Sequence, residues 1–286
     1  SLSLYASSVH TTECGVDRCS WRSPVILAAM TSRAVAPFSS LSVRRAVLSL
    51  LQRSMRPCWT PELSSQYLAE AAETGMYECS KFGGPHPWIS ATHTWPQCNA
   101  CNTPMTFLTQ LNFHDLPQKA QTALGQSSGL VQLFLCTCES CSQGGTSHVV
   151  RLVDPTSSSE QLLLDATPEG GAPPLPCQWI TGWVEQEDYP DIEELDLGME
   201  FDPGDEEVLA ALDDHPCRQG DKVSGYPFWL QGEQYPVCQE CSSPMNLLMQ
   251  LDSLQGLNYS FGDSGFGYIF QCRRHHEHLE FDWHCM

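Results

Sequence analysis

Positive charge is scarce in this sequence, and long apolar runs are missing from it. The 286 residues include 14 lysines and arginines against 34 aspartates and glutamates, which gives a formal net charge of −20. Affinity for nucleic acid depends on basic side chains that neutralise phosphates, so this charge argues against DNA or RNA and favours a basic protein as partner. No apolar run approaches the roughly 20 residues that cross a bilayer, so no membrane contact is expected.

Cysteine, in contrast, is abundant, and the chain contains 15. Secreted disulfide scaffolds are usually shorter and contain an even number of cysteines. The sequence therefore predicts reduced thiols and a cytoplasmic location. A mitochondrial location is the alternative, because residues 31–61 contain five arginines, several serines and no acidic residue, as presequences do. We favour a different interpretation of this stretch, an amphipathic helix that packs on the domain and ends before Pro57.

Composition divides the chain into four parts. Residues 1–40 are expected to be an N-terminal extension that need not be ordered, and 41–155 a leading helix with a first β-rich repeat. Residues 156–216 are expected to be a Ser/Pro/Gly linker and an acidic insert, and 217–286 a second β-rich repeat. Fourteen acidic residues crowd positions 185–214, with apolar residues between them. Either part of this insert folds, or it binds a partner that is both basic and apolar.

An internal duplication underlies this division. Residues 95–112 (WPQCNACNTPMTFLTQLN) and 235–252 (YPVCQECSSPMNLLMQLD) are identical at eight of 18 positions, including two cysteines at C-x-x-C spacing and the Pro-Met after them. Further matches flank these segments: Gly84 with Gly225, Trp88 with Trp229, and 129–136 (GLVQLFLC) with 265–272 (GFGYIFQC). The sequence therefore predicts an α+β but mainly β fold, with two pseudo-symmetric β-rich repeats and a few helices.

Each repeat offers the ligands of a tetrahedral zinc site. Two cysteines at C-x-x-C spacing lie on a tight turn and can direct both thiolates at one metal ion, which then needs two more Cys or His ligands. Cys136 and Cys272 end matching strand-like runs and are the expected third ligands. The expected fourth ligand is Cys141 in the first site and His275 or His276 in the second, with Cys138 and His278 left as neighbouring alternatives.

The sequence thus predicts two structural zinc ions, each in a probable zinc knuckle of its repeat. The predicted ligands are Cys98, Cys101, Cys136, Cys141, Cys238, Cys241, Cys272, His275 and His276. Disulfides are the alternative if the protein is extracellular. A thioredoxin-like pair is not favoured, because that motif opens a helix, whereas here a strand-like run follows. A catalytic zinc is not favoured either, because no H-E-x-x-H motif is present and four ligands leave no open position.

One further motif, GDSG at residues 262–265, matches a protease motif by coincidence. Residues 262–265 (GDSG) spell the nucleophile motif of chymotrypsin-like proteases, but the His-bearing motif of that family is missing from the sequence before them. The repeat places these residues in a turn before a strand, as it does Gly129 in the first copy. Ser264 is therefore not expected to act as a nucleophile.

Several segments, in order along the chain, resemble the YwqG-like family, a domain family of unknown function. They are SKFGGPHPWI, the first C-x-x-C segment, GLVQLFLC, ITGWVEQEDYP, GDKVSGYPFWLQ, GDSGFGYIF and DWHC, and the resemblance as a whole spans roughly residues 41–286. More distantly, the repeated C-x-x-C, Pro-Met and Phe-x-Cys pattern resembles programmed cell death protein 2 and its relatives. The resemblance to the YwqG-like family implies a duplicated, mostly β fold. The more distant resemblance implies a chaperone role toward a ribosomal protein.

Two functions from different classes follow. The first is a non-enzymatic, zinc-stabilised module that binds a basic protein, as a chaperone or adaptor for a client such as a ribosomal protein. The charge of −20 favours it. The alternative is a hydrolase that works in a cleft between the repeats with Asp263, His275 and His278. We expect the protein not to be an enzyme, because the sequence offers no complete catalytic motif.

Overall fold

The structure is a computed structural model, and the part described lies within one compact unit, Ser39–Met286. It describes residues 40–66, 75–138, 141, 147–156, 161–162, 167–191, 194–195 and 206–286. The extension expected over 1–40 lies outside the described residues except for Ser40, and so do parts of the expected linker and acidic insert. None of the described helices is long and apolar enough to cross a membrane.

The described residues are mainly β, with a few short helices, as predicted. The helices are α1 (Ser40–Ser54), α2 (Gly75–Glu78), α3 (Gln118–Leu124) and α5 (Glu206–Asp213), and η1 (Phe113–Asp115) is a 3-10 turn. The strands are β1 (Arg56–Ser64), β2 (Lys81–Phe82), β3 (Ile89–Ser90), β4 (Thr106–Asn112), β5 (Leu130–Leu135), β6 (His148–Val153), β7 (Gln161–Leu162), β8 (Gln178–Asp188), β9 (Lys222–Ser224), β10 (Asn246–Asp252), β11 (Phe266–Gln271) and β12 (Leu279–His284).

Ten of these strands form one antiparallel sheet in the order β12-β11-β10-β9-β1-β8-β2-β4-β5-β6. The remaining strands, β3 and β7, pair only with each other. The two edges of the large sheet approach one another, because the His148 ring of β6 lies 5.2 Å from the Phe281 ring of β12. β4, β5, β10 and β11 are almost entirely buried, although β4 and β10 also contain buried polar residues such as Gln110 and Gln250.

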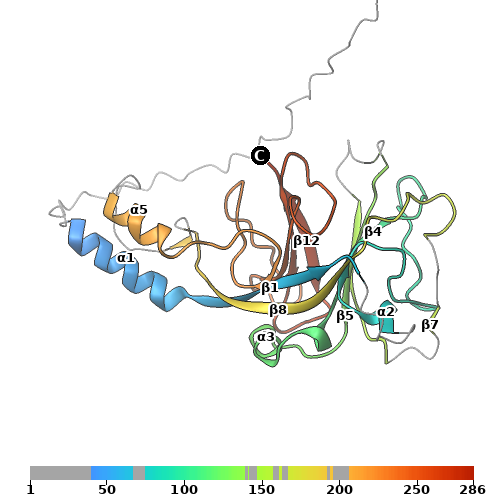
Figure 1. Cartoon of the computed structure of the whole chain (residues 1–286), viewed down its shortest axis with the longest axis horizontal. Helices are drawn as coiled ribbons and strands as arrows, with labels where there is room; N and C mark the ends of the chain where they lie inside the picture. Colours follow the sequence, from blue (N-terminus) through green and yellow to red (C-terminus); the bar gives the residue numbers. More distant parts are fainter. Residues whose placement is uncertain are drawn as a thin grey trace, which may run out of the picture. The chain divides into compact units, whose positions relative to one another are not determined.

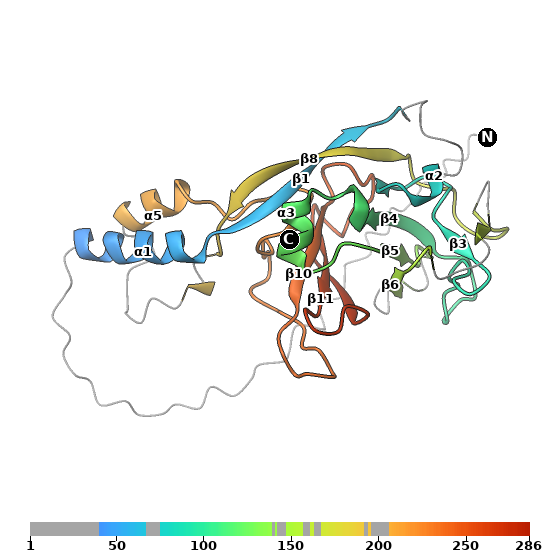
Figure 2. The same ribbon diagram turned by 90° about the horizontal axis from the view of Figure 1, so that it is seen from below.

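The centre of the sheet is the long antiparallel pair β1 and β8 (Figures 1 and 2). On one side follow β2, β4, β5 and β6, which we call the first half; on the other follow β9 to β12, the second half. β1 precedes the first half in sequence but pairs with β9 of the second, and β8 precedes the second half but pairs with β2 of the first. The range 156–216, expected as linker and acidic insert, therefore supplies a central strand.

One apolar core lies across both halves of the sheet. It includes Leu108 and Leu133 from the first half, Leu248 and Ile269 from the second, and Trp59 from β1, all of them 1% exposed or less. At about 25 cal/mol per Å² of apolar surface, burial of this kind is the main favourable term in folding. The shared core therefore fixes the two halves against each other.

A second, smaller core joins α1 to α5. Val47 and Leu51 of α1 are fully buried against Val208 and Ala211 of α5, with Leu195 beside them. Figures 1 and 2 show the two helices side by side at one end of the β1–β8 pair. The helix predicted before Pro57 is thus present and packs through its apolar face. Among the described residues of the acidic insert, Leu195, Val208 and Ala211 are thus part of a core, whereas Leu209 is exposed; 192–193 and 196–205 lie outside the described residues.

Candidate metal centres

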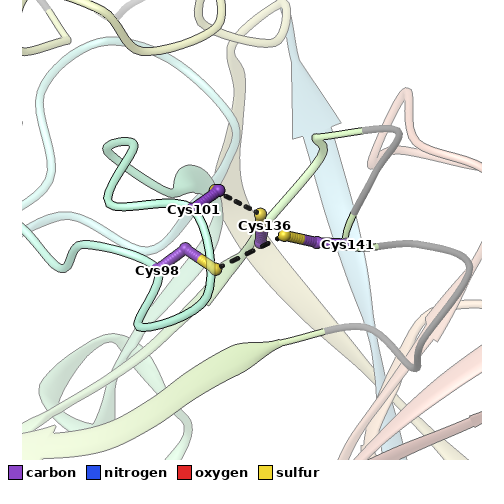
Figure 3. A group of neighbouring side chains, drawn as sticks. All are labelled: Cys98, Cys101, Cys136 and Cys141. Carbon is purple, nitrogen blue, oxygen red and sulfur yellow. Dashed lines mark hydrogen bonds between the residues drawn. The ribbon is translucent and has the colours of Figure 1, made fainter.

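Four of the predicted ligands meet at the end of β4 and β5. Cys98 and Cys101 come from the turn before β4, and Cys136 and Cys141 follow β5. Figure 3 shows their side chains directed toward one another, with Cys98 opposite Cys141 and Cys101 opposite Cys136. All four sulfur atoms lie within 4.8 Å of one another, so this first cluster could hold a metal ion.

The distances between sulfur atoms fit a tetrahedral metal site. Zn–S bonds of about 2.3 Å place two thiolates of a tetrahedron roughly 3.8 Å apart. The Sγ atoms of Cys98 and Cys141 are 3.8 Å apart, and those of Cys101 and Cys136 are 3.7 Å apart. A disulfide would need about 2.05 Å, and every described cysteine is free. The donor set and its spacing therefore suit a metal ion and not a disulfide.

The second cluster lies at the matching place in the second half. Its ligand atoms, from Cys238, Cys241, Cys272 and His275, also lie within 4.8 Å of one another. The Sγ atoms of Cys241 and Cys272 are 3.6 Å apart, and His275 Nδ1 is 3.5 Å from Cys238 Sγ and 3.8 Å from Cys272 Sγ. A tetrahedral site with one shorter Zn–N bond requires about 3.6 Å between sulfur and nitrogen. The Cys3His set therefore fits as well.

Of the two histidines expected as fourth ligand, the structure brings only His275 into the second cluster. His276 Nδ1 lies 3.0 Å from Gln126 Oε1, and its Nε2 lies 3.0 Å from the carbonyl oxygen of Arg273. His278, a neighbouring alternative, comes closer, with Nδ1 3.4 Å from Cys238 Sγ. In the first half, Cys141 joins the cluster, and Cys138 packs against its apolar surroundings.

The same backbone hydrogen bonds build both cysteine turns. In the first, Cys98 N donates to Thr103 O at 2.9 Å and Asn102 N to Cys98 O at 2.8 Å. In the second, Cys238 N donates to Ser243 O at 3.0 Å and Ser242 N to Cys238 O at 2.8 Å. Asn102 and Ser242 both take a left-handed backbone conformation, with φ of 56° and 53°. Short polar residues tolerate this conformation, which turns the chain after the second cysteine back so that the next carbonyl accepts from the N–H of the first.

Ionisation within the first cluster is uneven. Burial opposes ionisation of Cys98, but the backbone N–H groups of Cys101 and Ala100 help to lower its pKa to about 6. The neighbouring Cys101 raises the pKa of Cys141 far above the ordinary thiol value. One thiolate therefore forms readily here and disfavours a second. A bound cation would relieve that repulsion, so the electrostatics as well as the geometry favour a metal ion.

The second cluster has the same asymmetry. The hydroxyl and the backbone N–H of Ser243 lower the pKa of Cys241 to about 6, while burial raises that of Cys238. The hydrogen bond with Cys272 raises the pKa of His275. A metal ion here would have to displace protons from the thiols and bind the histidine in its neutral form, so its affinity must fall at acid pH.

The likeness of the halves extends beyond the cysteines. Gln110 Oε1 accepts the N–H of Trp88 at 3.0 Å, and Gln250 Oε1 accepts that of Phe228 at 2.7 Å. The carbonyl of Trp88 accepts from Gln132, and that of Phe228 from Tyr268. Phe228 is therefore the structural counterpart of Trp88 in the second half. This corrects the sequence alignment, which paired Trp88 with Trp229. The shift arises because the loop after Gly84 is one residue longer than its counterpart.

The two matched glycines are explained by what lies against them. A Cβ on Gly84 would lie 2.8 Å from Cys177 Sγ, and one on Gly225 would lie 2.1 Å from Asp188 Oδ2 and 3.0 Å from Cys58 Cβ. Cys58 and Cys177 thus occupy corresponding places, one against the matched glycine of each half. Sequence reasoning missed this pair, although both cysteines follow a proline (Pro-Cys-Trp and Pro-Cys-Gln-Trp).

The residues proposed for a hydrolase do not line the described clefts. A narrow pocket has room for about one water, 20 Å³, beside Arg56, Ser224 and Arg273, and an open cleft of 440 Å³ lies between α3 and the β1–β8 pair, with Trp59 and Lys119 in its wall. Neither includes Asp263, His275 or His278. Ser264 lies in the turn before β11 with φ of 56°.

Comparison with known proteins assigns the chain to a family. Residues 80–285 match the family described as "Domain of unknown function (DUF1963)", and this chain belongs to it. The match includes both clusters and every strand from β2 to β12. The chain has no match among curated proteins.

Proposed function

We propose that this protein is a non-enzymatic protein-binding module, built from two copies of one β-rich unit that each enclose a structural zinc ion. The closed donor sets carry this proposal. Each cluster supplies four protein ligands, which complete a tetrahedron and leave no position for a substrate or a water. Zinc is the ion that best suits four thiolate and imidazole donors in tetrahedral geometry. Free thiols at all described cysteines fit the cytoplasmic location we propose.

The partner we propose is a basic protein. The net charge of −20 attracts one at long range, and three exposed carboxylates lie on α5 and directly after it, Glu206, Asp213 and Asp214. The distant resemblance to programmed cell death protein 2 and its relatives supports a chaperone or adaptor role toward a client such as a ribosomal protein. The hydrolase alternative gains nothing from the clefts, because its three residues lie outside both.

Zinc content tests the metal part of this proposal. We expect two zinc equivalents in the wild type and one each in Cys98→Ser and Cys238→Ser, because each variant removes a ligand from one cluster only. Cys285→Ser, a partly buried thiol outside both clusters, is the matched control and should retain two. Elemental analysis by mass spectrometry gives the readout. Equal metal content in all four proteins would sink the assignment.

Capture of the client tests the partner. The wild type is compared with a triple variant that neutralises α5 (Glu206→Gln, Asp213→Asn, Asp214→Asn) and with a control that neutralises three exposed acids elsewhere (Glu169→Gln, Asp263→Asn, Glu277→Gln). Deleting the insert is unsuitable, because β8 and α5 belong to the fold. We expect a basic protein in native pull-downs, weakened by the α5 variant and not by the control. Absence of any basic partner from the wild type would refute this function.

A further inference from the structure

The two halves differ at one edge, which a described strand covers in the first half and no described strand covers in the second. In the first half, β3 (Ile89–Ser90) pairs with β7, an antiparallel strand from the 156–166 region (Figures 1 and 2). Ile89 is 1% exposed and Ser90 is fully buried. The added strand thus completes the edge of the first half near its cysteine turn.

The equivalent of β3 in the second half is the segment Trp229–Leu230. The matched hydrogen bonds of Trp88 and Phe228 to Gln110 and Gln250 fix the start of the comparison. Its end is fixed by two further bonds: Met105 N donates to Pro96 O at 2.9 Å, and Met245 N donates to Pro236 O at 2.8 Å. The chain between these points has the same length in both halves. Ile89 therefore corresponds to Trp229, and Ser90 to Leu230.

No described strand pairs with Trp229 or Leu230. Both side chains are partly exposed, whereas their counterparts in the first half are buried. Apolar residues left open at an unpaired edge are a common place for another chain to add a strand. The difference between the halves is therefore explained if the second edge takes its strand from another molecule.

The open edge is also rigid. The Trp229 ring lies 5.2 Å from the Tyr235 ring in a perpendicular arrangement, and 6.0 Å from the Phe270 ring in a stacked one. Trp229 Nε1 donates to Glu194 Oε1 at 2.6 Å, and the Tyr235 hydroxyl donates to Glu194 Oε2 at 3.0 Å. A surface fixed in advance loses little entropy when a ligand binds.

Charge at this edge selects a basic ligand. After Lys222, which is buried, the sequence contains no lysine or arginine until Arg273. Burial raises the pKa of the Glu194 carboxyl, and its two hydrogen bonds lower it. The negative charge of the exposed Glu233 also raises this pKa, which shows that the two acids lie near each other. The positive charge of Arg56 lowers the pKa of Glu194, but the Arg56 guanidinium stacks on the Tyr226 ring at 4.1 Å. Carboxylates beside aromatic faces favour a ligand with cationic side chains.

We propose that the Trp229–Leu230 edge binds an extended segment of a partner protein as an added antiparallel strand, in which basic residues alternate with apolar ones. This proposal rests on the proposed function, since it names a further surface, besides the α5 carboxylates, that contacts the basic client. Backbone hydrogen bonds would align the segment, as β7 is aligned on β3. Successive side chains point to opposite faces, so its apolar side chains would cover Leu230 on one face, and its basic ones would lie on the Trp229 face, where Glu194 binds the indole.

The probe is a short peptide, acetylated and amidated, in which arginine and valine alternate; a second peptide has glutamate in place of arginine. Affinity is measured for the wild type, for Leu230→Ser and for Leu254→Ser, a matched control whose leucine is 74% exposed outside this edge. We expect the arginine peptide to bind and the glutamate peptide not to bind. Loss of the Leu230 contact should weaken binding about tenfold, while Leu254→Ser leaves it unchanged. All three proteins should contain equal zinc, which confirms that they fold.

Amide hydrogen exchange locates the peptide. We expect the amides of Trp229 and Gln231 to exchange rapidly in the free protein and slowly with the peptide bound; the Leu230 N–H is not used, because it already donates to the Tyr268 hydroxyl. Protection of these amides before the peptide is added would mean that this chain already covers its own edge, and would overturn the proposal. Equal peptide affinity in Leu230→Ser and the wild type would also overturn it. If Leu230→Ser still captured the basic client from a lysate, the edge would be wrong while the proposed function stood.

Discussion

Two buried lysines occupy corresponding places in the sheet and have different surroundings. Lys81 pairs in register with Gln110, and Lys222 with Gln250. Lys222 Nζ lies 2.8 Å from Asp188 Oδ2, and both side chains are fully buried. Lys81 Nζ donates to the carbonyl oxygen of His86, and burial lowers its pKa to about 8. A sequence gives no hint of such lysines, because this residue type is almost always exposed.

Lys222→Met should be the more damaging of two matched substitutions. It leaves the buried Asp188 carboxylate without its cation, although the N–H groups of Arg218 and Tyr226 still donate to it. Breaking a buried ion pair on one side costs about 3–5 kcal/mol. Lys81→Met removes a charge that burial already disfavours and should cost less. Urea unfolding at pH 7 measures both; an equal loss in the two variants would contradict this account.

The burial of Lys81 also predicts that the stability of the folded state depends on pH. Its pKa falls from 10.5 to about 8 on folding, so the folded state binds the proton less well than the unfolded state. The contribution to stability is therefore full above pH 10.5 and is lost as pH falls through about 8. Relative to Lys81→Met, the wild type should gain roughly 3 kcal/mol between these limits. Urea unfolding of both proteins at pH 7 and pH 10.5 tests it, and a constant difference would refute it.

At the scale of elements, local signals were predictable and long-range pairing was not. The spacing of Cys98 and Cys101 predicted a shared turn, and the alignment of Cys136 with Cys272 predicted two residues that the structure brings into the clusters. The choice between His275 and His276 depends on how the loop after β11 folds, which spacing does not fix. The pairing of β1 with β9 joins residues more than 160 positions apart, and no local pattern encodes it.

The α1–α5 pair is a distinct element of stability. Leu51 is fully buried between these helices, while Leu209 on α5 is 45% exposed. Leu51→Ala should cost about 2–5 kcal/mol, because it leaves a cavity, and Leu209→Ala should cost under about 0.5 kcal/mol. Urea unfolding gives the readout, and zinc content should stay at the wild-type value in both. Similar losses in the two variants would show that the helices do not pack as described.

At the scale of the whole molecule, the crossed pairing of β1 and β8 makes the halves interdependent. The first half pairs through β2 with β8, which precedes the second half in sequence, and the second half pairs through β9 with β1, which precedes the first. The halves also touch near the second cluster, where Gln271 Nε2 donates to Gln126 Oε1 at 2.7 Å. A unit joined in this way should unfold in one step, although its sequence suggests two repeats.

If each cluster binds the zinc ion we propose, loss of one ion should therefore destabilise the whole sheet. For Cys98→Ser, we expect a single thermal transition with Tm lowered on the order of 10 °C or more, because metal binding contributes directly to folding. Calorimetry of this variant beside Cys238→Ser and the control Cys285→Ser measures it. Two separate transitions, only one of them shifted in each cluster variant, would show that the halves are independent.

The crossed strands also constrain how the protein is made. As the chain leaves the ribosome, β2 and β4 to β6 emerge before β8, so the first half has a bare inner edge until residues 178–188 follow. β1 remains without its partner β9 for longer still, and until then it exposes backbone groups that other nascent chains could pair with. The order of synthesis therefore runs against the order of pairing. A protein that we propose as a chaperone would itself need protection until its last third is complete.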